Sequence, residues 1–88
     1  MHDASHIWTL DVSGQKCPMP IIKLQQCLRQ LKQDNQQHIT QVNVITTDPS
    51  APQDLESWCR VNKYVFLACQ AQDNGHICSV GIDIAGDP

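Results

Sequence analysis

The chain has 88 residues, of which 41% are hydrophobic, and its formal net charge is −3. This length allows one domain with a single small core, so we predict one domain over residues 1–88, with a core over about 7–84 and frayed ends at 1–5 and 85–88. No apolar run approaches the ~18–20 residues that span a bilayer, and the acidic balance speaks against direct binding of nucleic acid. The first residues lack the basic and apolar regions of a signal peptide, so we expect a cytoplasmic protein that does not bind membranes.

The first half of the chain predicts a strand, a helix and a second strand. Residues 6–12 alternate in polarity, which is typical of a strand, and Ser13-Gly14 ends it. A helix follows, because apolar residues recur at steps of three and four. That stripe consists of Ile21, Leu24, Leu28 and Leu31. β-branched residues dominate 39–46, which predicts the second strand.

The second half predicts a helix and a hairpin. Ser50 and Gln53 fit a capping box for a second helix, which carries Trp58-Cys59 and ends at Asn62-Lys63. A third strand at 64–71 leads into Asp73-Asn74-Gly75, a strong hairpin signal, and a fourth strand at 76–84. The order β-α-β-α-β-β predicts an α+β fold. We expect a two-layer α/β sandwich with both helices on one face of a four-stranded mixed sheet.

The five cysteines are the main candidates for chemistry, and they stand at positions 17, 27, 59, 69 and 78. An odd number in a cytosolic protein argues for free thiols. No C-x-x-C pair or other regular metal spacing occurs among them, so we expect no metal site, and we find no cofactor motif. Four of the five fit ordinary core positions in predicted helices and strands.

Cys17 differs from the other cysteines by its context, because Pro18 and Pro20 follow it at the start of the first helix. Prolines are tolerated in the first turn, where N–H groups have no partner within the helix. We place Cys17 at or beside the N-cap, with both prolines in the first turn. There the helix dipole, free N–H groups and the neighbouring Lys16 favour the thiolate. The prediction is a reactive, exposed cysteine.

A single activated thiolate suits sulfur transfer better than hydrolysis or redox exchange. Hydrolysis by cysteine needs a base, and no histidine lies near Cys17 in the sequence. Redox exchange favours a resolving cysteine nearby. We therefore expect Cys17 to attack an electrophilic sulfur, carry it and hand it on.

Basic residues gather on or near the first helix, among them Lys16, Lys23 and Arg29. One interpretation is an ordinary solvated helix face. The other is a basic rim around Cys17 that docks an acidic protein partner or a phosphate-bearing substrate.

Residues 10–20, Leu-Asp-Val-Ser-Gly-Gln-Lys-Cys-Pro-Met-Pro, resemble the signature Leu-Asp-x-x-Gly-x-x-Cys-Pro-x-Pro of the TusA/SirA/YedF family of small sulfur carriers. Asp48-Pro49 and Trp58-Cys59 are further matches. The resemblance implies the same sandwich fold and a sulfurtransferase of the persulfide-carrier type. In this family Cys17 would accept sulfane sulfur from a protein like a cysteine desulfurase or a rhodanese. It would then pass the sulfur to an acceptor protein, for transfer-RNA thiolation or other sulfur trafficking.

Three supporting residues also match family positions: Asp11, Gly14 and Asp48. Each has a simpler interpretation as well, since Asp11 could end the strand, Gly14 could supply a permissive backbone and Asp48 could form a turn.

Two alternatives stay open at this point. The chain could be a non-catalytic regulatory module that binds RNA or protein, with Cys17 merely structural. It could also be a redox-sensing thiol protein, in which Cys17 forms a disulfide with Cys27 or Cys59.

Overall fold

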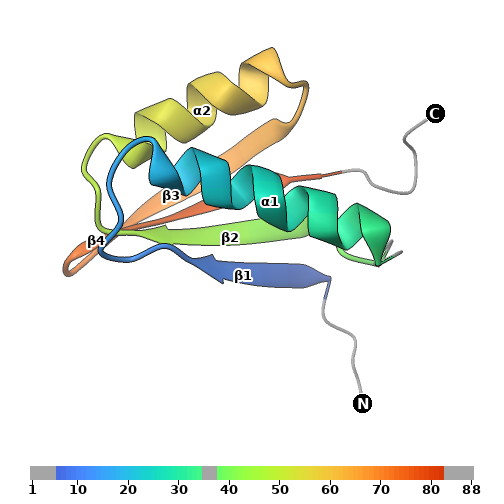
Figure 1. The fold of residues 1–88 in the computed structure, drawn as a ribbon. Helices are drawn as coiled ribbons and strands as arrows, with labels where there is room; N and C mark the ends of the chain where they lie inside the picture. The colour runs from blue at the N-terminus through green and yellow to red at the C-terminus, as the bar shows by residue number, and fades with distance from the viewer. Residues whose placement is uncertain (1–5, 35–37, 83–88) are drawn as a thin grey trace.

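The computed structural model describes residues 6–34 and 38–82 (Figure 1). The predicted frayed ends at 1–5 and 85–88 lie outside the described residues, as do the last two residues of the predicted fourth strand. Six elements follow one another in the predicted order. They are β1 (Ile7–Asp11), α1 (Met19–Gln33), β2 (Gln41–Thr46), α2 (Ala51–Val61), β3 (Val65–Gln72) and β4 (Gly75–Gly81).

The strands form one mixed sheet in the order β1-β2-β4-β3. β1 runs parallel to β2, while β4 runs antiparallel to both of its neighbours, β2 and β3. Both helices cover the same face of this sheet, as Figure 1 shows. The predicted α+β sandwich is therefore confirmed.

The core lies between the helices and the covered face of the sheet. Strand alternation directs every second side chain toward the helices, so the buried residues of β2 and β4 face the apolar stripes of α1 and α2. The side chains that meet there include Leu24, Leu28, Leu31, Val42, Val44, Leu55, Cys59, Cys78 and Val80. Burying one leucine side chain stabilises the fold by roughly 1.5–3 kcal/mol, so this layer supplies much of the folding energy.

The cysteines other than Cys17 occupy this core or its margin. Cys59 and Cys78 are buried, while Cys27 and Cys69 are partly buried and pack against the core. Trp58 is partly buried and packs against the core. Its ring stacks on the Tyr64 ring with centroids 5.3 Å apart.

Two local predictions about helix starts are wrong. Helix α1 begins at Met19, so Pro18 is the N-cap residue and only Pro20 lies in the first turn. Ser50 is the N-cap of α2, but its side chain makes no capping bond. Its hydroxyl and its N–H both donate to Asp48 Oδ1, each over 3.1 Å, because the carboxylate is the stronger acceptor.

The parallel pairing of β1 and β2 decides where a site can form. Strands that run parallel end at the same edge of the sheet, so α1 and α2 both start at that edge. The loop after β1 carries Cys17, and the loop after β2 carries Asp48. The fold thus brings together two segments that lie about thirty residues apart in the sequence.

Candidate active site

Cys17 is exposed and lies immediately before the N-cap of α1. Its backbone N–H donates a hydrogen bond of 2.8 Å to Asp48 Oδ2. The contact joins the loop after β1 to the loop after β2 through the main chain of Cys17. This bond fixes the main chain at residue 17 and does not involve the side-chain sulfur.

Asp48 does more than form a turn. Its side chain is 9% exposed, and it accepts hydrogen bonds from Cys17 and from both donors of Ser50. The bond from the Ser50 N–H, the bond from the Cys17 N–H and the nearby charge of Lys16 lower the pKa of Asp48 below its ordinary value. The ionised carboxylate thus organises the loop that positions Cys17.

Gly14 and Asp11 shape the loop before Cys17. Gly14 has a φ of +81°, a left-handed conformation that glycine adopts without strain, and its N–H donates to Thr47 Oγ1 over 2.8 Å. Asp11 Oδ1 accepts the Ser13 N–H over 2.9 Å, and hydrogen bonds from Ser13 lower the pKa of Asp11. Both residues act on the backbone of the loop, as their simpler interpretation predicts.

The Cys17 thiol lies near a carboxylate that was not among the predicted site residues. Asp54, a partly buried residue near the start of α2, lies close enough for its carboxylate to raise the pKa of the Cys17 thiol. The interaction with this side chain, loss of solvent, and the negative charges of Asp54 and Asp48 raise the pKa of Cys17 above its ordinary value. The prediction that the helix start favours the thiolate in the free protein is wrong.

The helix start also offers fewer N–H donors than expected. The Met19 N–H is already bonded to the Lys16 carbonyl over 2.8 Å, and Pro20 has no N–H. The Cys17 N–H is directed at Asp48. Two acidic side chains therefore outweigh the helix dipole at the sulfur.

Asp54 could have been found from topology. The sequence shows an acidic residue in the first turns of the second predicted helix, a common feature of helix starts. A strand-helix-strand unit with parallel strands places the starts of the first and second helices at the same edge of the sheet. Together, these two observations would have predicted that Asp54 lies near Cys17.

Replacing Asp54 with asparagine tests its effect on the thiol. Asp54→Asn removes a negative charge that favours the protonated sulfur, so the pKa of Cys17 should fall. The pH profile of alkylation by iodoacetamide is expected to move to lower pH, with a several-fold faster reaction at pH 7. Alkylation is followed by mass spectrometry of the peptide that contains Cys17.

Glu56→Gln is the matched control for this experiment. Glu56 is an exposed carboxylate on the same helix, with Arg60 as its neighbour at 4.0 Å. Its replacement should leave the pH profile unchanged. Equal profiles for Asp54→Asn and the unchanged chain would show that Asp54 does not govern the thiol.

The three predicted basic residues do not form one continuous rim. Lys16 lies close enough to Asp48 for its charge to act on that carboxylate. Lys23 lies beside Trp8 on the β1 side of α1, whereas Arg29 lines a groove on the α2 side of the same helix. Arg29 is also ten residues beyond Met19, about 15 Å along the helix axis. Lys16 and Lys23 remain candidates for docking at the Cys17 end, and Arg29 faces another surface.

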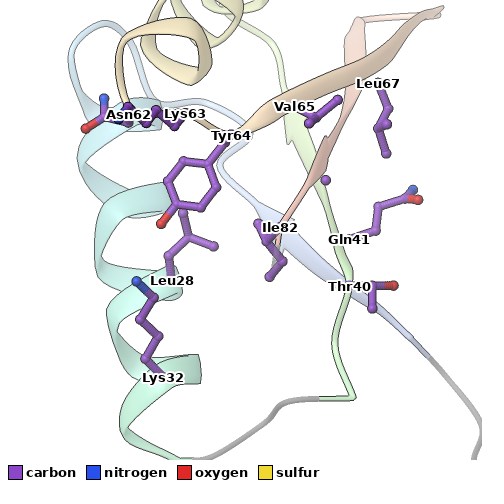
Figure 2. A pocket seen from close by; sticks show the side chains of 11 residues that line it. Leu28, Lys32, Thr40, Gln41, Asn62, Lys63, Tyr64, Val65, Leu67 and Ile82 are labelled. Carbon is purple, nitrogen blue, oxygen red and sulfur yellow. The ribbon is translucent and has the colours of Figure 1, made fainter. Parts of the chain in front are cut away.

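A hollow lies at the opposite end of the sandwich (Figure 2). It measures about 590 Å³ and lies between the ends of both helices and the sheet. Its lining residues are Leu28, Lys32, Thr40, Gln41, Asn62, Lys63, Tyr64, Val65, Leu67, Gly81 and Ile82. Cys17 does not line this hollow and is itself exposed.

Two further features are absent from residues 6–34 and 38–82. No three histidine, cysteine or acidic side chains in these ranges are grouped so that they could hold a metal ion. No helix within them is long and apolar enough to cross a membrane.

Comparison with known proteins identifies the family. The family model described as sulfurtransferase TusA matches residues 8–81, which include most of β1, the Cys17 loop and both helices. The chain belongs to the TusA family. The resemblance seen in residues 10–20 is therefore confirmed for most of the chain.

Proteins described as sulfur carriers are similar to this chain over different shares of their own length. A protein of Neisseria meningitidis serogroup A, described as a sulfur carrier, is 40% identical over 65 residues, which cover 74% of this chain and 81% of the relative. The sulfur carrier protein TusA of Pseudomonas entomophila is 36% identical over 67% of this chain and 68% of its own length. A longer Aquifex aeolicus protein, also described as a sulfur carrier, is 28% identical over 82% of this chain and 34% of its own.

Proposed function

We propose that this TusA-family protein is a sulfurtransferase of the carrier type, with Cys17 as its persulfide site. One observation supports this most directly. Cys17 is the exposed member of the five cysteines, and its main chain is tied to Asp48 while its thiol stays accessible. An exposed thiol whose main chain is held by a hydrogen bond suits a cysteine that must receive sulfur from one protein and give it to another.

The transfer needs no oxidant and no bound cofactor. The Cys17 sulfur attacks the outer sulfur of a donor persulfide, R–S–SH. A new S–S bond forms on Cys17, the S–S bond of the donor breaks, and the donor leaves as the thiol R–SH. The proton released by Cys17 ends on the donor sulfur, so atoms and charge balance.

Asp54 is the group placed to handle this proton. Its carboxylate lies near the Cys17 thiol and acts on the pKa of that thiol, and a general base must come within hydrogen-bond reach of the proton it takes. Because the acidic side chains raise the pKa of the thiol, Cys17 needs a group that takes its proton when it attacks the donor. This arrangement replaces the histidine that cysteine hydrolases use.

The partners follow from the same chemistry. We propose a donor of the cysteine desulfurase or rhodanese type and a protein acceptor, acting in the cytoplasm, with transfer-RNA thiolation or other sulfur trafficking as the destination. Lys16 and Lys23 lie at the Cys17 end of α1 and would contact acidic surfaces on these partners.

The test is a loading reaction with a cysteine desulfurase and cysteine. Mass spectrometry without reductant should show a gain of about 32 Da, the mass of one sulfur atom. Trypsin cuts after Lys16 and Lys23, so peptide 17–23 contains Cys17 as its single cysteine. The adduct is expected on this peptide. Its appearance only on peptide 24–29, which contains Cys27, would contradict the proposal.

A further inference from the structure

Cys69 and Cys78 form a close pair of thiols away from Cys17. They stand directly opposite each other on the antiparallel strands β3 and β4. Their sulfur atoms are 3.1 Å apart. Cys78 is buried, whereas Cys69, on the edge strand β3, is partly exposed.

We propose that Cys69 and Cys78 are a site of reversible oxidation, at which they form a cross-strand disulfide. Opposite residues of an antiparallel pair have Cα atoms about 4.5–5.5 Å apart, within the 4.4–6.8 Å range of disulfides. The sulfur atoms need to approach by only about 1 Å to reach the bonded distance of about 2.05 Å. Small rotations of the two side chains supply this movement.

The two cysteines differ in ways that assign them different roles. Burial, a hydrogen bond with Cys69 and the neighbouring Cys59 raise the pKa of Cys78 to about 12. Cys78 is therefore a protonated, shielded thiol. Cys69 is the sulfur that a small oxidant from solvent can reach first.

A hydroperoxide is the class of oxidant that fits this geometry. The Cys69 thiol reacts with ROOH to give a sulfenic acid and ROH. The Cys78 sulfur then attacks the Cys69 sulfur, the S–S bond forms, and water leaves with the sulfenic oxygen and the Cys78 proton. The two thiols lose two electrons and two protons in total, and the peroxide takes them up.

The hairpin is already built for this bond. Asp73 and Asn74 form a two-residue turn between β3 and β4, and the register from Gln72↔Gly75 back to Cys69↔Cys78 is continuous. The bond closes a short loop within one hairpin, so the sheet does not have to rearrange. Closing a loop stabilises the folded state by restricting the unfolded chain.

The test uses the full chain with Cys17→Ser, so that sulfur carriage at Cys17 plays no part in the result. Protein treated with a few equivalents of hydrogen peroxide is expected to lose about 2 Da, and dithiothreitol should reverse this loss. No lysine or arginine follows Lys63, so both cysteines lie in tryptic peptide 64–88, which should carry the change. The melting temperature should rise by roughly 5 °C or more.

Matched variants locate the bond. Cys69→Ser should abolish the loss of 2 Da, and Cys27→Ser, at another partly buried cysteine, should retain it. The proposal is overturned if peptide 64–88 keeps its mass, if it gains about 32 Da per thiol by oxidation to sulfinic acid, or if it becomes linked to another peptide. Mapping of peptide 64–88 with both cysteines present decides the question even where a variant folds poorly.

Discussion

Replacing Cys17 by serine is expected to abolish sulfur loading and to leave the fold intact. Serine cannot form a persulfide, so the adduct of about 32 Da should fall by roughly a hundredfold or more. The fold should persist because the structural contact of residue 17 is its backbone N–H to Asp48, which serine keeps. Loading is measured by mass spectrometry and the fold by circular dichroism, with an unchanged melting temperature.

Cys27→Ser is the matched control for loading. Cys27 is partly buried, and burial raises its pKa, so it contributes little reactive thiolate. This variant should load like the unchanged chain. Persistent loading of Cys17→Ser would move the persulfide to another cysteine and refute the proposed function.

Gly75→Ala should destabilise the protein strongly and weaken the Cys17 site. A Cβ atom at Gly75 would collide with the Thr46 carbonyl oxygen and lie 2.9 Å from Thr47 Cα, both backbone atoms that cannot move aside cheaply. We expect a loss of about 3 kcal/mol in the free energy of unfolding. Thr47 accepts the Gly14 N–H, so the disturbance should reach the loop before Cys17. Urea unfolding followed by circular dichroism measures the loss.

Gly81→Ala provides the comparison within the same strand. The atoms nearest to its added Cβ would belong to the flexible Leu67 side chain, at 3.4 Å or more. The free energy of unfolding should change by less than about 1 kcal/mol. Similar stabilities of the two variants would show that the close approach of Gly75 to β2 does not limit the fold.

The sequence was sufficient for the architecture because its periodicities are clear. Alternation in β2 and the stripe from Leu24 to Leu31 both correspond to buried faces. The hairpin signal at 73–75 marks the turn between β3 and β4. The signal did not decide the register, because it spans three residues. The structure places Asp73 and Asn74 in the turn, and this sets Cys69 opposite Cys78.

The electrostatics of Cys17 could not be read from its neighbours in the chain. Lys16 and the start of α1 adjoin Cys17 in the sequence, and both favour the thiolate. The opposing groups, Asp48 and Asp54, come from the next loop and the next helix. A pKa depends on all charges within a few ångströms, and only the fold places those charges.

The position of β4 has a consequence for how the protein reaches its fold. It is the last strand in sequence order among the described residues, yet it lies between β2 and β3 and bonds to both. Before residues 75–81 leave the ribosome, β3 has no partner strand, and the core lacks Cys78 and Val80. Such long-range pairing delays folding until the distant segments can meet. We therefore expect the sheet to form only once residues 75–81 can pair with both of their neighbouring strands.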